Sequence, residues 1–370
     1  MAPKQSSAWD RTAPACDPVN SQQQHRILVF GAGAVGTLLG GILAGAGHDV
    51  TLLGRGPRIT KIQSNGLGVT LHDRQFRTTP HAVSSLDEIE GRYSIVLLCV
   101  RAWSVQDSLQ AIPDLLTPDG TLVTMQNGIG TEEIVSQHLS DIRHAAGSLT
   151  LSADIDAPDA VSSSSRSGGI AFAPVSDQVD VGFVSRCFDQ AGIPTACLDD
   201  YRSMKWSKLL LNQMANGIPA ILDWTPGQLY RHGAAFHVEL AMLRETIRTI
   251  EADGAKLVSL PGFPVSLLRW VLQLPAGIVR RLLLRRVEGG RGSKLPSMLI
   301  DLRAGRTELE ADWLYGAVSA TAERHGIPAP VNQRINAILN GIARNPHLRA
   351  AFRNHPDRLL RNIERAMNEA

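Results

Sequence analysis

The chain has 370 residues, of which 44% are apolar, and a formal net charge of +2. This length and apolar content suffice for two domains with buried cores, and the near-neutral charge gives no indication of nucleic-acid binding. The four cysteines are widely spaced and form no CxxC pair, which favours free thiols in a reducing compartment and predicts no bound metal. They are Cys16, Cys99, Cys187 and Cys197.

Residues 1–25 contain no apolar stretch of the kind found in a secretory signal, and their Ser, Gln and Pro content predicts a disordered leader. No stretch of about 18 apolar residues lacks charge, so we expect no transmembrane helix and a cytoplasmic location. The most apolar region, 263–287, is interrupted by arginines and two prolines. It predicts either ordinary helices of a domain or a basic amphipathic helix at a membrane surface.

The first half of the chain alternates between strand-like and helical patterns. A helical pattern of small and apolar residues follows the first strand, and another surrounds residues 104–112. Such alternation predicts a doubly wound parallel sheet in the α/β class. A Ser/Gly-rich loop at 162–169 is flanked by candidates for extra strands at the sheet edge. The buried strands are predicted at residues 26–30, 48–55, 94–100 and 121–127.

A glycine-rich turn follows the first predicted strand. Gly31, Gly33 and Gly36 form G-x-G-x-x-G between a strand and a helix, with Ala34 and Val35 in the same turn. The first glycine permits a tight turn, the second lets the backbone approach a pyrophosphate, and the third allows close helix–strand packing. The helix N-terminus then offers N–H groups to the anion. The pattern predicts a Rossmann-type dinucleotide site.

The residue at the end of the second strand selects the cofactor. NAD sites place an acid there for the ribose 2′-OH, whereas this chain has Arg55. An arginine pairs well with a 2′-phosphate, so we expect NADPH/NADP, with an ordinary surface charge as the alternative. Two further strand ends carry polar residues, Arg101 in one case and Gln126–Asn127 in the other. Asn127 is interpreted as a cofactor or substrate contact or as turn chemistry.

The second half, after about residue 200, shows helical periodicity without convincing strands. An all-helical C-terminal domain therefore follows the Rossmann-type domain, with the boundary near 195–203. We predict a leader at 1–25, a nucleotide-binding domain at 26–198, a helical substrate and catalytic domain at 199–344 and a basic helical tail at 345–370.

One helix of this second half, "KWSKLLLNQMANG", carries Lys208, Asn212 and Asn216 four residues apart among apolar residues. On a helix this spacing gives one polar stripe. A lysine facing the interdomain cleft can protonate a carbonyl oxygen that gains charge as hydride arrives, and the two amides can hold substrate. A solvated stripe on an amphipathic helix is the alternative.

These segments together resemble the ketopantoate reductase (2-dehydropantoate 2-reductase) family over about residues 26–342. The motifs are "GAGAVG", "RAW", "QNGIG", "KWSKLLLNQMAN", "SMLIDLRAGRTELEADWLYG" and "HGIPAPVN". The resemblance implies NADPH-dependent reduction of ketopantoate to pantoate in pantothenate and coenzyme A biosynthesis. A different 2-oxo acid or ketone substrate, or a non-catalytic NADP-binding protein, remains as an alternative.

The resemblance also implies roles for single residues. Lys208 matches the lysine that protonates the ketone, and Asn212 and Asn216 match two substrate-binding amides. Ser297 matches the serine that contacts the substrate carboxylate. The family glutamate matches Glu310 best, with Glu308 as the alternative. Gly31, Gly33, Ala34, Val35, Gly36, Arg55, Arg101 and Asn127 are expected to bind the cofactor.

This chain departs from the family pattern at three positions. Arg101 replaces the usual lysine, Gly217 follows Asn216 where relatives have proline, and Pro226 stands in place of an asparagine. The segment 258–295 is also longer and more basic. Gly217 and Pro226 lie on the substrate side, so the identity of the oxo acid is the least constrained part of the prediction. The sequence does not fix the oligomeric state, and a homodimer is one option.

Overall fold

The computed structural model describes residues 24–165, 167–177, 179–288 and 295–369. Residues 1–23 of the predicted leader, and with them Cys16, lie outside the described residues. The chain divides into two compact units. The first comprises Met1–Gln126, Val135–Tyr201 and Leu260–Gly262, and the second comprises Asn127–Ile134, Arg202–Ser259 and Phe263–Ala370. Each unit therefore includes a short segment from within the other's stretch of sequence.

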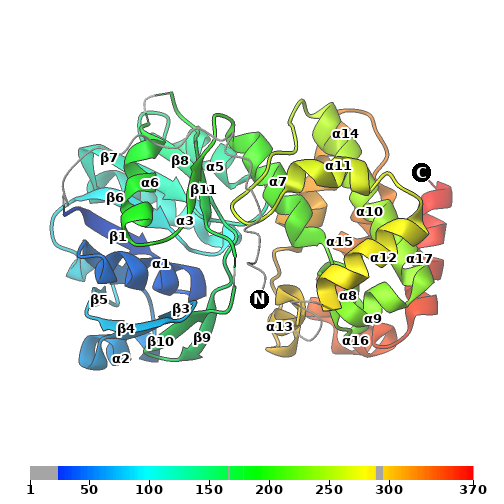
Figure 1. Cartoon of the computed structure of the whole chain (residues 1–370), viewed down its shortest axis with the longest axis horizontal. Helices are drawn as coiled ribbons and strands as arrows, with labels where there is room; N and C mark the ends of the chain where they lie inside the picture. The colour runs from blue at the N-terminus through cyan, green and yellow to red at the C-terminus, as the bar shows by residue number, and fades with distance from the viewer. Residues whose placement is uncertain (1–23, 166, 178, 289–294, 370) are drawn as a thin grey trace, which may run out of the picture. The chain divides into compact units, whose positions relative to one another are not determined.

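The first unit contains an eight-stranded sheet in the order β12-β11-β8-β7-β6-β1-β2-β5 (Figure 1). Neighbouring strands are parallel except β8 and β11, which pair antiparallel. The predicted doubly wound sheet is confirmed. The two candidate extra strands around the Ser/Gly-rich loop overlap β8 and β11, and β9 and β10 lie between them in the chain. The strands are β1 (Arg26–Phe30), β2 (Asp49–Leu53), β5 (His81–Val83), β6 (Tyr93–Leu98), β7 (Leu116–Thr124), β8 (Arg143–Leu149), β11 (Ile170–Pro174) and β12 (Thr195–Cys197).

A second, four-stranded sheet in the order β4-β3-β10-β9 is absent from the sequence prediction. Its strands are β3 (Leu67–Leu71), β4 (Arg74–Thr78), β9 (Asp154–Ala157) and β10 (Ala160–Ser163). The helical pattern predicted around residues 104–112 is confirmed as a succession of short helical elements. The segment consists of short turns of helix, among them α3 (Val105–Ser108) and α4 (Ile112–Leu115), because Pro113 cannot donate within a continuous helix.

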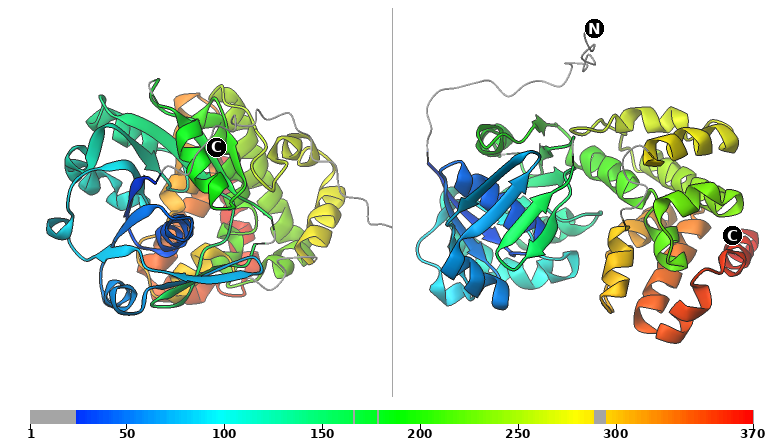
Figure 2. Two further views of the ribbon diagram at one scale, coloured as in Figure 1. Left: turned by 60° about the vertical axis from the view of Figure 1, so that its left-hand side comes forward. Right: turned by 60° about the horizontal axis from the view of Figure 1, so that its bottom comes forward.

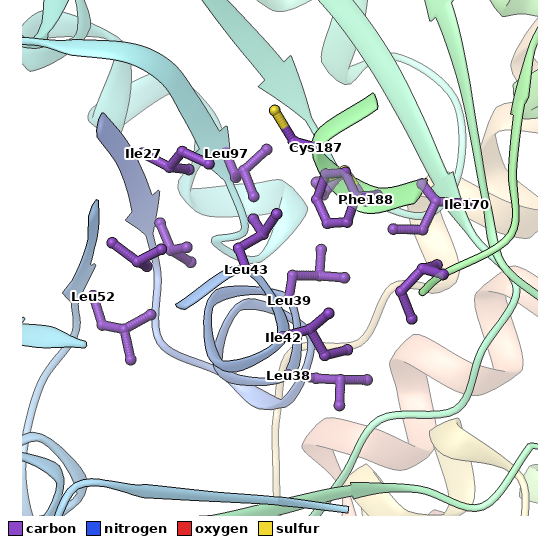
Figure 3. Close-up of a cluster of buried hydrophobic side chains, with 14 of the residues drawn as sticks. Ile27, Leu38, Leu39, Ile42, Leu43, Leu52, Leu97, Ile170, Cys187 and Phe188 are labelled. Atoms are coloured by element: carbon purple, nitrogen blue, oxygen red, sulfur yellow. The ribbon is translucent and has the colours of Figure 1, made fainter. Parts of the chain in front are cut away.

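The core of the first unit surrounds α1 (Ala34–Gly45), as Figure 3 shows. Leu38, Leu39, Ile42 and Leu43 are at most 2% exposed, and they belong to a cluster with the central strands and α6 (Val181–Gln190). Burying four such side chains contributes on the order of 6–12 kcal/mol. This packing fixes the start of α1, and with it the glycine turn, against the end of β1.

The second unit is built from helices in the part that the structure describes. Helix α17 packs on α10 and α15, which places the C-terminal tail on this unit (Figure 2). No helix among the described residues is long and apolar enough to cross a membrane. The longer elements are α7 (Tyr201–Gln213), α8 (Gly217–Leu222), α9 (Pro226–Arg231), α10 (Gly233–Ala252), α12 (Ala276–Glu288), α13 (Ser297–Arg303), α14 (Ala317–Arg324), α15 (Pro330–Arg344), α16 (Pro346–Phe352) and α17 (Pro356–Glu369).

Candidate active site

The glycine turn has the geometry that dinucleotide binding requires. Gly31 has φ of 114°, and a Cβ there would lie 2.8 Å from the Val100 backbone nitrogen. A Cβ on Gly36 would lie 2.1 Å from the Gly31 carbonyl oxygen, so helix and turn pack too closely for a side chain. A Cβ on Gly33 would meet nothing within 4 Å. The space beside Gly33 is therefore open. In such turns a pyrophosphate approaches the backbone at this second glycine.

The N-terminus of α1 is suited to an anion. Gly33 is its N-cap and provides no side-chain cap, and the first turn, which begins with Ala34 and Val35, carries no acid. The first N–H groups of a helix lack intrahelical acceptors and lie at the positive end of its dipole. These residues fit a dinucleotide phosphate.

Two arginines follow β2. Arg55 is exposed just after the strand, as a 2′-phosphate contact would have to be. The sequence prediction missed Arg58, in the first turn of α2 (Pro57–Asn65). Its Nη1 atom is buried without a hydrogen-bond partner among the described residues, and burial lowers the pKa of the guanidinium. An unsatisfied cationic donor beside this strand end fits a phosphate, and the pattern "RGPR" was the available signal.

The ends of β6 and β7 are joined by a buried glutamine. Gln126 Nε2 donates to the carbonyl oxygens of Leu98 at 2.8 Å and Val100 at 3.0 Å. Arg101 follows this junction, with its guanidinium carbon 5.7 Å from the ring centroid of Trp103. Gln126 thus fixes the loop that carries Arg101, next to the strand β1 that leads into the glycine turn.

The turn after Gln126 belongs to the second unit and packs on the π-helix η5 (Asp312–Gly316). Gly128 has φ of 91°, and a Cβ there would lie 2.4 Å from the Trp313 carbonyl oxygen. The Ile129 N–H donates to that same oxygen at 3.1 Å. Only glycine satisfies both the backbone angle and the approach, so the Asn-Gly pair serves close packing as well as turn formation.

Three of the predicted site residues form one hydrogen-bonded row within the second unit. Asn212 Nδ2 donates to Asn127 Oδ1 at 3.0 Å, and Asn127 Nδ2 donates to Glu310 Oε2 at 3.2 Å. Glu310 is partly buried, whereas Glu308 is exposed. Of the two candidate glutamates, the geometry brings Glu310 into the row.

Asn216 does not continue the helical stripe that the spacing predicts. Helix α7 ends at Gln213, and Ala215 adopts a left-handed φ of 52°. Asn216 is instead the N-cap of α8 and is only 7% exposed. Its Nδ2 donates to the Asn212 carbonyl oxygen at 2.9 Å and to Ser297 Oγ at 3.4 Å, and its Oδ1 accepts from the Met298 N–H.

Two buried side chains hold this junction between α7 and α8. Glu239, fully buried on α10, accepts a hydrogen bond from the strained Ala215 N–H. Burial raises the pKa of the Glu239 carboxyl to about 8. The Tyr315 hydroxyl accepts from the Gly217 N–H at 2.8 Å, and a Cβ at 217 would lie 2.4 Å from that hydroxyl. Gly217, where the family resemblance predicts a proline, therefore packs directly against the Tyr315 hydroxyl.

Lys208 lies on α7 and is partly exposed. Three residues earlier, Lys205 is 2% exposed and its Nζ lies 2.8 Å from Oε1 of Glu132, which is 1% exposed. Thr131 donates a further hydrogen bond to Glu132 at 3.0 Å. The sequence prediction missed this pair, although the spacing of Lys205 and Lys208 places both near one face of the helix. The pair joins α7 to the segment that carries Asn127.

Two further positions singled out in the sequence, Ser297 and Pro226, are the first residues of helices. Ser297 is exposed at the first position of α13, within reach of Asn216. Pro226 is buried at the first position of α9, behind a capping box formed by Thr225 and Gln228. Proline is favoured at this position because its missing N–H has no intrahelical acceptor. Pro226 thus has a structural role and no side-chain donor for a substrate.

The sequence matches two family models, described as ketopantoate reductase PanE/ApbA over residues 27–177 and its C-terminal counterpart over residues 200–343. Together these matches span both units. The chain belongs to the ketopantoate reductase family. The predicted resemblance is confirmed, and this family comprises oxidoreductases that act on CH–OH donors with a nicotinamide cofactor.

Relatives of the ketopantoate reductase family match most of the chain. The 2-dehydropantoate 2-reductases of Halobacterium salinarum and Pyrococcus horikoshii are each 28% identical, over 83% of this chain and 95% and 94% of their own. The solved structure of a family ketopantoate reductase from Ralstonia eutropha is 26% identical with a TM-score of 0.71, and covers 86% of this chain and 98% of its own. A D-mandelate dehydrogenase solved with NADH and anilino(oxo)acetate shares the fold at 20% identity, with a TM-score of 0.72 over 87% of this chain and 99% of its own.

Proposed function

We propose that this chain reduces 2-dehydropantoate to pantoate with NADPH, a step in pantothenate and coenzyme A biosynthesis. The curated relatives that carry this name support the reaction. The observation that carries the proposal is the hydrogen-bonded row of Asn212, Asn127 and Glu310, with Lys208 one helical turn before Asn212 on α7. A lysine among neutral amides and one carboxylate suits a polar substrate with a reducible carbonyl.

The roles of the side chains follow from their chemistry. NADPH supplies the hydride when it is bound. Lys208 donates a proton to the ketone oxygen, directly or through a water, as charge develops on that oxygen. Ser297 donates a hydrogen bond to the substrate carboxylate, and Asn216 positions Ser297. Glu310, held by Asn127, accepts a hydrogen bond from a substrate hydroxyl.

NADPH is favoured over NADH by the charges at the end of β2. No acid stands there to accept a ribose 2′-OH, whereas Arg55 is exposed and Arg58 has an unsatisfied donor. A 2′-phosphate would pair with both guanidinium groups. Gly31, Gly33 and Gly36 would hold the pyrophosphate, with Arg101 at the neighbouring strand end.

The test is NADPH consumption by the purified full chain with ketopantoate and a panel of other 2-oxo acids. Lys208→Ala should lower kcat by about 10²–10⁴-fold, the usual value of a positioned proton donor, while NADPH affinity is kept. Lys256→Ala, an exposed lysine elsewhere in the second unit, is the matched control. Full turnover in Lys208→Ala would rule out the lysine assignment.

A reductase of another 2-oxo acid or ketone is the second candidate. Two features favour it. Tyr315 packs against Gly217, and Pro226 occupies the first position of α9 where the family resemblance predicts an asparagine, so both change the substrate side of the site. A clear preference for ketopantoate across the panel would remove this candidate. NADPH binding without turnover of any oxo acid would instead favour a non-catalytic NADP-binding protein.

Two further parts of the proposal concern the state of the protein. We propose a cytoplasmic enzyme that binds small molecules and no nucleic acid, with a homodimer as the state to test. Light scattering on the purified chain measures the oligomeric state, and cell fractionation measures the location.

A further inference from the structure

The segment from 265 to 288 carries one row of buried and one row of exposed large apolar side chains. It comprises the 3₁₀ turn η4 (Val265–Leu267), α11 (Leu268–Val271) and α12. Its inner face is buried in the second unit through Val265, Leu272, Val279 and Leu283, which are at most 7% exposed. An ordinary surface helix pairs such a face with a polar outer face.

The outer face of this segment carries a second row of large apolar side chains, which we call the outer stripe. Successive members are three or four residues apart, so Ile278 and Leu282 share one face of α12, and Leu267, Trp270 and Leu274 precede them across the break at Pro275. The outer stripe consists of Leu267 (57% exposed), Trp270 (68%), Leu274 (39%), Ile278 (50%) and Leu282 (44%). Five neighbouring exposed apolar side chains, one of them tryptophan, are typical of an interaction surface.

The outer stripe lies in a strongly basic segment. Residues 263–287 contain five arginines and no aspartate or glutamate, whereas the whole chain has a net charge of only +2. Arg281 and Arg285 are exposed on α12 next to the outer stripe. Arg269 pairs with Glu251 at 2.8 Å and also lies 5.3 Å from the Trp270 ring centroid. The charge around the stripe is therefore positive.

The outer stripe is fixed from inside the unit. Arg244 on α10 donates from Nε to the Leu272 carbonyl oxygen and from Nη2 to the Leu274 carbonyl oxygen, both at 2.9 Å. These bonds satisfy carbonyl groups at the break before Pro275, where the helical pattern is interrupted. The two halves of the segment are thereby held so that Trp270 and Leu274 stay on the outside.

We propose that the outer stripe and its arginines bind the surface of a membrane that contains anionic lipids. A helix lying in the interface buries apolar side chains below the headgroups while its basic groups contact phosphates, and tryptophan favours that depth. A second copy of this chain fits less well, because a two-fold contact through the stripe would set arginines against arginines. This inference does not depend on the proposed reaction.

The test uses the full-length protein and sedimented vesicles of phosphatidylcholine with and without phosphatidylglycerol. We expect binding only to the anionic vesicles, with release at high salt. Arg281→Gln with Arg285→Gln should weaken binding by about 25-fold, about fivefold for each arginine. Trp270→Ser with Ile278→Ser should abolish sedimentation through loss of apolar burial.

The control is Leu86→Ser with Ile155→Ser, which removes exposed apolar side chains of the first unit and should leave vesicle binding unchanged. Thermal unfolding of each variant shows that it is folded. Equal binding to neutral and anionic vesicles, or no binding to either, would overturn the proposal. A concentration-dependent dimer that the Trp270→Ser/Ile278→Ser variant abolishes would overturn it in favour of self-association.

Discussion

At the scale of single residues, Arg58 is the candidate cofactor contact that the structure adds to those expected from the sequence. Its buried Nη1 lacks an acceptor, and a 2′-phosphate would supply one. We expect Arg58→Ala to weaken NADPH binding by roughly tenfold or more, the value of one charge-assisted hydrogen bond, and to leave NADH binding unchanged. Fluorescence titration of both cofactors measures this. Arg74→Ala, an exposed arginine of the second sheet, is the control, and equal loss for NADH would contradict the assignment.

Glu310 and Glu308 offer a matched pair. Glu310 accepts a hydrogen bond from Asn127, whereas Glu308 is exposed. Glu310→Gln should therefore disturb the hydrogen-bonded row of Asn212, Asn127 and Glu310, and Glu308→Gln should leave it unchanged. We expect kcat/KM for the preferred oxo acid to fall by about tenfold to a hundredfold in Glu310→Gln, because a charged acceptor is replaced by a neutral one. Steady-state kinetics of both variants measures the loss of kcat/KM. A larger loss in Glu308→Gln would assign the substrate-binding role to Glu308 instead of Glu310.

The motif residues could be proposed from the sequence because their signals are local. The glycine turn, Asn127 with its glycine and Lys208 each follow from a few neighbouring residues. Arg58, Lys205 and Glu239 were not found, because their importance lies in what surrounds them. Each is a single charged residue in the sequence, and only the fold shows that a donor is unsatisfied, an ion pair is buried or a carboxyl meets a strained N–H.

Between elements, the buried pair of Lys205 and Glu132 ties α7 to the segment of Asn127. Breaking such a pair leaves one buried charge and typically costs about 3–5 kcal/mol. We expect that loss of unfolding free energy in Lys205→Met. The double variant Lys205→Met with Glu132→Gln should recover most of it, because no charge is then buried. Urea unfolding measures both, and a double variant no more stable than the single would show that the charges are not the cause.

The junction between α7 and α8 depends on a carboxyl group whose pKa is raised by burial. Glu239 titrates near its ordinary value of 4.5 in the unfolded chain and at about 8 in the folded protein. Its contribution to stability is complete below about pH 4.5 and is lost as the pH rises toward 8, because the unfolded state releases the proton first.

Glu239→Gln keeps an acceptor for the Ala215 N–H and removes the titration. Between about pH 5 and pH 8 the wild type should therefore lose on the order of 4 kcal/mol relative to this variant. Urea unfolding at several pH values measures the difference, with Glu323→Gln, an exposed glutamate on α14, as control. A difference independent of pH would show that Glu239 does not titrate in this range.

An element can be predicted from the sequence when the residues that cause it to form are close to one another in the chain. Strand β1, the glycine turn and α1 were predicted because a buried run, glycines and helical spacing are adjacent. The end of α7 at Gln213 was not, because Ala215 is held left-handed by Glu239, which lies on a later helix. The second sheet was also missed, although its β3 strand alternates buried and partly buried residues. Its pairing with β10 joins distant parts of the chain.

At the scale of the whole molecule, the two units do not correspond to two uninterrupted stretches of sequence. Residues Asn127–Ile134 belong to the second unit although the first unit continues at Val135. A fragment that ends at residue 198 would therefore carry Glu132 and Asn127 without Lys205, Asn212 and Glu310. We expect this fragment to unfold at a lower temperature than the intact chain, since a buried carboxylate would lose its partner.

Mixing that fragment with residues 199–370 should restore part of the lost stability, because the second fragment supplies the missing partners. Circular dichroism melting of each fragment, of the mixture and of the intact chain measures this. As a control, the Glu132→Gln change should raise the melting temperature of the first fragment, where the carboxylate is unpaired, and lower that of the intact chain, where it is paired. A first fragment that melts like the intact chain would show that the segment 127–134 contributes nothing to its stability, and that position 198 is a true domain boundary.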